Sequence, residues 1–305
     1  MSLDLNELKK GGLLKQKQKD YFILRTRIPG GYLKADALEK FRYIAKKYGR
    51  GYIHLSVRQC IEVAWIHLKD LEKVKKKLGK VGISTGACGP RSRNVVACPG
   101  SSVCRFGFTD TEALSKKLDK EFFGRDVPKK FKIGISGCLN SCSKPQENDI
   151  GFMAVGYLEC DLKICTGCTL CANVCEKVCA RAEAPLYPNE YKRAQAKPAI
   201  VMDENKKPVY KKELCFFEGD CVRVCPVDAW KVNRVGYTVF LGGKVGRFPM
   251  LGYKIAEFVT EEDIFTITEK AIACYNRIAE KGQRFGEAIN KVGIEEVKKQ
   301  ILWTK

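Results

Sequence analysis

The chain has 305 residues, of which 45% are hydrophobic and 16 are cysteine, and its formal net charge is +20. It has no run of about 18 uninterrupted apolar residues, so no membrane-spanning helix is expected, and its apolar content excludes a disordered chain. Such a basic balance suggests an acidic partner, for which nucleic acid is one candidate. Lys and Arg are, however, spread along the whole chain without a basic tail or a recognised nucleic-acid motif, and a strongly anionic cofactor would also account for part of the charge. The charge alone does not choose between them.

The first eighty residues alternate between strand and helix signals. Strands are expected at 21–28, 52–57 and 61–66, and amphipathic helices at 36–49 and 71–79. Pro29-Gly30-Gly31 ends the first strand with a break, and Asp36 with Glu39 has the pattern of a capping box. This order predicts an α+β fold with the sheet on one side and the helices on the other.

A second unit follows, and a cysteine-rich segment interrupts it. Strands are expected at 94–97, 131–136, 150–155 and 237–241, and helices at 111–123 and from Thr260, which caps a long amphipathic segment together with Asp263. Residues from about 160 to 232 are predicted to form an inserted domain, in which 180–208 is an elaborated loop. The predicted domains are 1–80, 81–158 with 233–305, and 159–232.

The cysteines fall into two kinds of spacing. One kind is Cys98-x5-Cys104 followed by Cys138-x3-Cys142. The other is the bacterial ferredoxin run, in which closely spaced thiolates wrap a cubane cluster; its members are Cys165, Cys168, Cys171 and Cys175, and then Cys215, Cys221 and Cys225 before Pro226. A disulfide framework is disfavoured because the chain is long, because its first twenty residues are polar rather than a signal segment, and because x2 spacing suits a metal. The sequence predicts a cytoplasmic iron–sulfur protein.

The first kind of spacing resembles the siroheme and [4Fe–4S] site of sulfite and nitrite reductases. Further segments resemble the same family in the same chain order: Thr26-Arg27-Ile28-Pro29-Gly30-Gly31, His54-Leu55-Ser56-Val57-Arg58-Gln59, Arg93-Asn94-Val95-Val96-Ala97-Cys98, Pro128-Lys129-Lys130-Phe131-Lys132, and the tail from Leu241-Gly242-Gly243-Lys244 to Arg284-Phe285-Gly286. The inserted ferredoxin domain makes the resemblance strongest to anaerobic and dissimilatory sulfite reductases, among them the siroheme-bearing C subunit of anaerobic sulfite reductase. The implied fold is a ferredoxin-like half domain plus a siroheme and [4Fe–4S] domain that carries the insert.

The resemblance also implies roles for individual residues. Siroheme carries eight carboxylates, which would offset much of the positive charge. Cys98, Cys104, Cys138 and Cys142 are expected to hold a [4Fe–4S] cluster, with Cys142 bridging to the siroheme iron. Arg27, Arg93, Lys130 and Lys132 match the anion-binding positions, and Lys130 and Lys132 share one face of a strand. The alternative is a set of solvated surface charges.

Two further positions match siroheme-carboxylate contacts. Arg58 is implied to make one such contact. His54 stands where some family members have Arg, and a satisfied histidine in the core is the alternative for it.

The second run of the insert departs from the ferredoxin pattern, because Glu218 stands where a cysteine is expected. The fourth cysteine of each run ligates the cluster of the other run. One [4Fe–4S] cluster would therefore take Cys165, Cys168, Cys171 and Cys225. The other would take Cys175, Cys215 and Cys221, with Glu218, Cys179 or Cys160 as the fourth ligand. A three-iron species, or a single cluster in the insert, is also open.

The function implied by the resemblance is the six-electron reduction of sulfite to sulfide. Electrons would enter through the insert from a low-potential donor protein or subunit. The alternatives are reduction of nitrite to ammonia and a non-catalytic electron-transfer subunit. Because the chain holds one copy of a module that the family uses in pairs, a homodimer or pairing with a related half-module subunit is expected.

Overall fold

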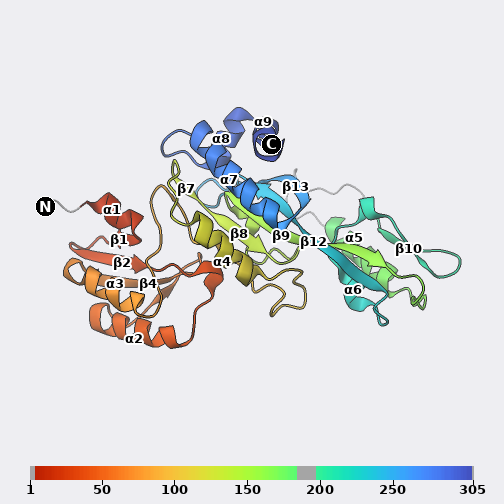
Figure 1. Cartoon of the computed structure of the whole chain (residues 1–305), viewed down its shortest axis with the longest axis horizontal. Helices are drawn as coiled ribbons and strands as arrows, with labels where there is room; N and C mark the ends of the chain where they lie inside the picture. Colours follow the sequence, from red (N-terminus) through yellow and green to blue (C-terminus); the bar gives the residue numbers. More distant parts are fainter. Residues whose placement is uncertain (1–3, 184–196, 304–305) are drawn as a thin grey trace. The chain divides into compact units, whose positions relative to one another are not determined.

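The computed structural model describes residues 4–183 and 197–303 (Figure 1). Contacts between residues divide the chain into two compact units, Met1–Ala154 with Tyr237–Lys305, and Val155–Gly236. No helix of the described residues is long and apolar enough to cross a membrane. The predicted domain limits, 1–80, 81–158 with 233–305, and 159–232, stay predictions.

The N-terminal part of the first unit is an antiparallel sheet with two helices packed on one face and a third, short helix beside its edge strand (Figure 1). The sheet order is β1 (Leu13–Lys15), β2 (Tyr21–Arg25), β4 (Ile61–His67) and β3 (His54–Leu55), and the helices are α1 (Leu5–Lys10), α2 (Asp36–Tyr48) and α3 (Leu71–Gly79). Phe41, Ile44 and Ala45 of α2 are buried as the apolar periodicity predicts. The predicted capping box at Asp36 is wrong, because the N-cap residue is Ala35, which has no side-chain acceptor.

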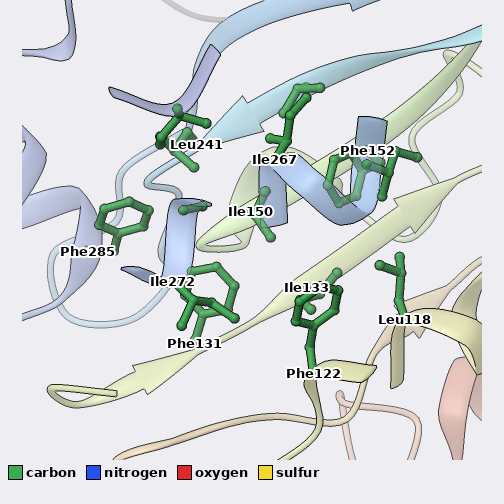
Figure 2. Close-up of a cluster of buried hydrophobic side chains, with 14 of the residues drawn as sticks. Leu118, Phe122, Phe131, Ile133, Ile150, Phe152, Leu241, Ile267, Ile272 and Phe285 are labelled. Atoms are coloured by element: carbon green, nitrogen blue, oxygen red, sulfur yellow. The ribbon is translucent and has the colours of Figure 1, made fainter. Parts of the chain in front are cut away.

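The rest of the first unit is built on a five-stranded sheet. Its order is β13 (Tyr253–Val259), β12 (Trp230–Leu241), β9 (Ile150–Cys160), β8 (Ile133–Ser136) and β6 (Val96–Ala97); β6, β8 and β9 are parallel, and β12 and β13 are antiparallel. The short strands β5 (Arg91–Ser92) and β7 (Lys130–Phe131) pair in parallel beside it. The helices are α4 (Thr111–Phe122), α7 (Glu261–Ile278), α8 (Phe285–Val292) and α9 (Ile294–Lys298). Side chains of β8, β9, α4 and α7 interlock in one core (Figure 2).

Two predicted features of this part are informative. The capping box of Thr260 and Asp263 is confirmed, with both side chain to backbone bonds formed at the start of α7. Strands β9 and β12 are longer than predicted. Each begins in one unit and ends in the other, so the predicted strands cover little beyond the part of each that belongs to the first unit.

Within the first unit, the turn at Pro29-Gly30-Gly31 joins the N-terminal sheet to the second sheet. Gly30 N donates to Val95 O at 3.0 Å, and the Ile28 backbone exchanges two hydrogen bonds with the Asn94 side chain at 2.9 and 2.8 Å. Gly30 has φ +61, and a Cβ there would lie 2.6 Å from Ser115 Oγ of α4. The predicted break is therefore a tight turn that only glycine fits.

The second unit contains α5 (Leu170–Glu183), the hairpin of β10 (Ile200–Met202) and β11 (Pro208–Tyr210), and α6 (Asp220–Val224). Its small core includes Leu158, Ala172, Ile200 and Trp230 together with Cys171 and Cys221. Residues 184–196 of the predicted loop 180–208 lie outside the described residues. The loop prediction was wrong for 180–183, which belong to α5, and for 200–202 and 208, which belong to β10 and β11.

Candidate functional site

Four cysteines of the first unit meet at one edge of the five-stranded sheet. Cys98 directly follows β6 and Cys138 follows β8, and the carboxyl ends of these neighbouring parallel strands share an edge. Burial raises the pKa of Cys138, and the nearby thiols of Cys98, Cys104 and Cys142 raise it further. The predicted ligands of the first cluster are therefore brought together.

The backbone around this cysteine set is shaped to hold it. Gly137 N donates to Cys98 Sγ at 3.1 Å. Gly100, between Cys98 and Cys104, has φ +67, and a Cβ there would lie 2.5 Å from Thr111 Oγ1. In residues 4–183 and 197–303, no three His, Cys, Asp or Glu side chains are grouped so as to hold a single ion. Thiolates around a cubane cluster stand farther apart than the ligands of one ion, and an all-cysteine set suits iron–sulfur chemistry.

A cluster of four cations, Arg58, Arg93, Lys130 and Lys132, forms the second part of the site. In the described part of the chain, none of the four forms an ion pair with a carboxylate. We call these residues the cation cluster. They are partly buried, and their electrostatic effects on one another indicate that they lie together.

Local pairing of β5 with β7 positions two of these cations, Arg93 and Lys130. Arg91 and Lys130 are paired residues of the two parallel strands, and Arg93 N donates to Phe131 O at 2.8 Å. The Arg93 guanidinium donates to the backbone oxygens of Ala87 and Gly89 at 2.6 and 2.7 Å. Carbonyl oxygens orient this guanidinium without neutralising its charge.

Burial and like charges make the cation cluster electrostatically strained. Burial, then Arg58 and Arg284, lowers the pKa of Lys132 to about 8. Burial, then Arg284 and Arg93, also lowers the pKa of Lys130. Burial lowers the pKa of Arg58 to about 10. An anion in this place would relieve each of these penalties.

Arg284 and Asp149, which were not predicted as site residues, form a buried ion pair beside the cation cluster. Their Nη2 and Oδ2 atoms are 2.8 Å apart, and the side chains are 6% and 0% exposed. Asp149 Oδ2 also accepts a hydrogen bond from the backbone N of Lys132 at 3.0 Å. The sequence could have pointed to Arg284, because it lies in the Arg284-Phe285-Gly286 segment that resembles the family. No sequence motif pointed to Asp149.

Arg27 does not join the cation cluster as predicted. Its Nε lies 2.5 Å from Asp119 Oδ2, and its guanidinium lies 4.0 Å from the centroid of the Phe123 ring. This ion pair neutralises the charge and ties the N-terminal part to α4. The structure thus brings together three of the four predicted anion-binding residues, and adds Arg58.

His54 lies on the surface. Its side chain is 66% exposed, with Nδ1 2.8 Å from Glu62 Oε2, and Glu62 also pairs with Arg25 at 2.6 Å. The alternative of a core histidine is wrong, because the flanking strand β3 is only two residues long and both are exposed. Its contact with siroheme stays a prediction.

An apolar cavity of about 610 Å³ lies between the Cys98–Cys104 loop and the segment that carries Arg58. Its lining includes Tyr32, Leu55, Gln59, Pro99 and Val103. Around it the surface stays apolar, since Leu55 and Val103 are largely exposed. Such a surface is typical of one that another apolar group covers.

The cations and the cysteines of one chain occupy opposite ends of β8. Lys132 directly precedes this strand and Cys138 follows it, a separation of up to about 20 Å at roughly 3.3 Å per residue. Ser143, the neighbour of Cys142, lies at the cysteine end, with its hydroxyl 2.7 Å from that of Ser136.

The second unit holds two cavities lined by cysteines. One is lined by Cys165, Cys168, Cys171 and Cys225, the set predicted for the complete cluster. Burial acts to raise the pKa of Cys225, but backbone N–H groups from Trp230, Val227 and Ala229 outweigh it and hold that pKa below its ordinary value. Hydrogen bonds of this kind stabilise a thiolate, so this set fits a cubane cluster.

The other cavity of the second unit is lined by Cys175, Cys179, Cys215, Cys221 and Glu218. Ala199 N donates to Cys175 Sγ and Phe217 N donates to Cys215 Sγ, both at 3.2 Å. The remaining candidate, Cys160, does not line this cavity; burial raises its pKa to about 11, helped by the thiols of the complete set.

The fold and the cysteine sites define an α+β iron–sulfur protein, and comparison with known families agrees. Residues 14–81 match the nitrite/sulfite reductase ferredoxin-like half domain, and residues 88–304 match the nitrite and sulphite reductase 4Fe-4S domain. The chain belongs to the nitrite and sulfite reductase family. The predicted fold class is thereby confirmed, and a [4Fe–4S] cluster and siroheme are the cofactors that this family supports.

Relatives by sequence include sulfite reductases. The chain is 33% identical to the coenzyme F420-dependent sulfite reductase of Methanocaldococcus jannaschii over 94% of its own length and 44% of that protein. It is 31% identical to an uncharacterized protein of the same organism over 96% of this chain and 94% of that protein. It is 31% identical to the C subunit of the anaerobic sulfite reductase of Salmonella typhimurium over 57% of this chain and 56% of that protein. The chain thus spans about half the length of the two named reductases.

Solved structures show the same fold at low sequence identity. Dissimilatory sulfite reductase I superposes with a TM-score of 0.71 at 18% identity, over 93% of this chain and 72% of that one. The NirA protein of Mycobacterium tuberculosis superposes with a TM-score of 0.65 at 18% identity, over 98% of this chain and 47% of that one.

Proposed function

We propose that this chain binds siroheme beside a [4Fe–4S] cluster and reduces sulfite to sulfide with six electrons. The observation that carries the proposal is the cation cluster, in which Arg58, Arg93, Lys130 and Lys132 are crowded together without a carboxylate partner. Burying like charges is unfavourable unless an anion completes the site. A polycarboxylate cofactor and an oxyanion substrate both fit this requirement.

The cysteine edge of the sheet is the proposed place of the cluster. Cys98, Cys104, Cys138 and Cys142 would hold it. Cys142 is assigned the bridge to the siroheme iron, as the resemblance implies, and it is the exposed member of the set. The apolar cavity beside the Cys98–Cys104 loop offers an apolar surface for the macrocycle. When bound, siroheme would supply the iron that binds sulfite and passes electrons to it.

The cation cluster would bind sulfite and deliver protons. Arg93, Lys130 and Lys132 are assigned to the anion, and Arg58 to a siroheme carboxylate. A lysine with a pKa of about 8 gives up its proton more readily than an ordinary lysine, so Lys132 is the best placed proton donor. Arg27 has no part in this proposal, because Asp119 neutralises it.

A complete site would need two modules. Because the cations and cysteines of one chain lie at opposite ends of β8, the cation cluster of one chain is proposed to face the siroheme bridged by Cys142 of a second chain. A homodimer, or a dimer with a related half-module subunit, meets this requirement. The exposed apolar rim near Leu55 and Val103 supports such a partner.

The insert is proposed to carry two more [4Fe–4S] clusters and to receive electrons from a low-potential donor. The two cysteine-lined cavities support this assignment. Use of cysteine as a cluster ligand also supports the predicted cytoplasmic location.

Steady-state turnover of the anaerobically reconstituted protein with sulfite and with nitrite, side by side, tests the proposal. A higher kcat/KM with sulfite is expected, together with siroheme bands in the visible spectrum. Preference for nitrite would make the chain a nitrite reductase, and absence of siroheme bands would leave an electron-transfer subunit.

A further inference from the structure

We infer that Cys179, rather than Glu218, is the fourth ligand of the second cluster in the insert, together with Cys175, Cys215 and Cys221. The inference rests on the proposed function only in that it takes the insert to bind iron–sulfur clusters. In the ferredoxin pattern the missing thiolate belongs at position 218 of the second run. Here it would come from the first run, extended by one helical turn.

Helix α5 places Cys175, the last cysteine of the first run, and Cys179 on one face. Cys175 and Cys179 are four residues apart on α5, so their side chains are neighbours separated by about 6 Å along the axis. Both line the same cavity as Cys215 and Cys221. Cys179 is only 5% exposed, so its thiol is held in the interior of the unit, where the cluster would lie.

The second cavity then has as many cysteines as the first. The first cavity is lined by four cysteines and no carboxylate. With Cys179 counted, the second is lined by four cysteines as well. Two of these, Cys175 and Cys215, already accept backbone N–H donors at 3.2 Å, as thiolate ligands do. A four-thiolate set on each cavity needs no unusual cluster in either place.

Glu218 lines the same cavity but fits it less well. Apart from the cysteines and Asp220, which pairs with Arg223, the lining is apolar and includes Val174, Val178, Ile200, Leu214 and Phe216. An ionised carboxylate turned into such surroundings loses its hydration, whereas a thiolate is the softer donor that iron–sulfur clusters prefer. The loop at Glu218 is tied instead to α6, since Arg223 Nη2 donates to the backbone oxygen of Glu218 at 2.6 Å.

The test compares Cys179→Ser with Glu218→Gln in the full chain, purified and reconstituted without oxygen. Iron and acid-labile sulfide per chain, and electron paramagnetic resonance of the oxidised and reduced protein, are measured. Cys179→Ser is expected to lose one cluster, about four irons per chain, or to convert it to a three-iron species that loses one. Glu218→Gln is expected to keep the wild-type iron content and spectra.

Cys160→Ser is the matched control, because Cys160 is a partly buried cysteine of the same unit that lines neither cavity. Retained siroheme bands and retained signals of the complete cluster show that Cys179→Ser has folded. Unchanged iron, sulfide and spectra in Cys179→Ser would overturn the inference, and loss of the cluster in Glu218→Gln alone would assign the ligand to Glu218. A wild-type chain with only one insert cluster would overturn it too. The sulfite proposal fails separately, through turnover and siroheme bands of the wild type.

Discussion

The first unit holds two groups of buried or partly buried cations, which differ in whether a carboxylate neutralises them. Arg27 and Arg284 pair with Asp119 and Asp149 at 2.5 and 2.8 Å. The cation cluster has no such partners and instead shows lowered pKa values. Paired cations stabilise the fold, whereas buried cations without partners are kept at a cost in stability and so indicate a binding role. Residue type alone does not separate the two groups.

The largest expected effect comes from breaking a paired cation. Arg284→Met leaves Asp149 buried without its partner, which costs about 3–5 kcal/mol. Chemical denaturation of the variant should show this loss in the free energy of unfolding. Adding Asp149→Asn should restore much of the stability, because the uncompensated charge is removed. Equal stability of the single variant and the wild type would contradict the structural role of this pair.

Removing a cation from the cation cluster should affect sulfite rather than folding. Lys132→Ala takes away one charged hydrogen bond, worth about 1.5–3 kcal/mol, and should lower kcat/KM for sulfite by roughly 10- to 150-fold. Lys130→Ala should act in the same direction. Lys129→Ala is the matched control, because Lys129 directly precedes Lys130 in sequence but its side chain is exposed. Wild-type kinetics in the first two variants would make these lysines mere surface charges.

The smallest expected effect is a dependence on pH. The folded pKa of Lys132, about 8, lies below its unfolded value, so between about pH 8 and 10.5 the folded state releases the proton first. The free energy of unfolding of the cofactor-free protein should therefore rise with pH across this window, by on the order of 1 kcal/mol after solvent screening. Lys132→Met should reduce the rise, and the lowered pKa of Lys130 leaves part of it. A fall in stability over the same window that depends on Lys132 would contradict the lowered pKa.

The sequence predicted most elements of the fold, because apolar periodicity and turn residues act locally. The helix at Thr111–Phe122 and the capping box at Thr260 are examples. The role of Arg27 could not be predicted, because its partner Asp119 lies 92 residues away. The Arg284–Asp149 pair, 135 residues apart, is a similar case.

The cysteines show the same limit. The ferredoxin pattern, in which the fourth cysteine comes from the other run, was enough to predict the set Cys165, Cys168, Cys171 and Cys225, which the structure brings to one cavity. The ferredoxin spacing made Glu218 a candidate ligand. The four-residue spacing from Cys175 to Cys179 indicates neighbouring side chains only when both residues are known to lie on a helix. Local pattern therefore predicts candidate ligands, and the fold decides which of them share a site.

Complementation between two inactive variants tests most directly the central claim, that the cation cluster and the bridging cysteine serve one catalytic centre. Arg93→Ala removes a cation at one end of β8, and Cys142→Ser removes the bridge at the other. Each variant alone should have lost sulfite turnover. After the two variants exchange protomers, a mixed dimer should hold one centre with an intact cation cluster facing an intact Cys142, so that part of the activity returns. No recovery of turnover despite confirmed exchange would contradict the shared site.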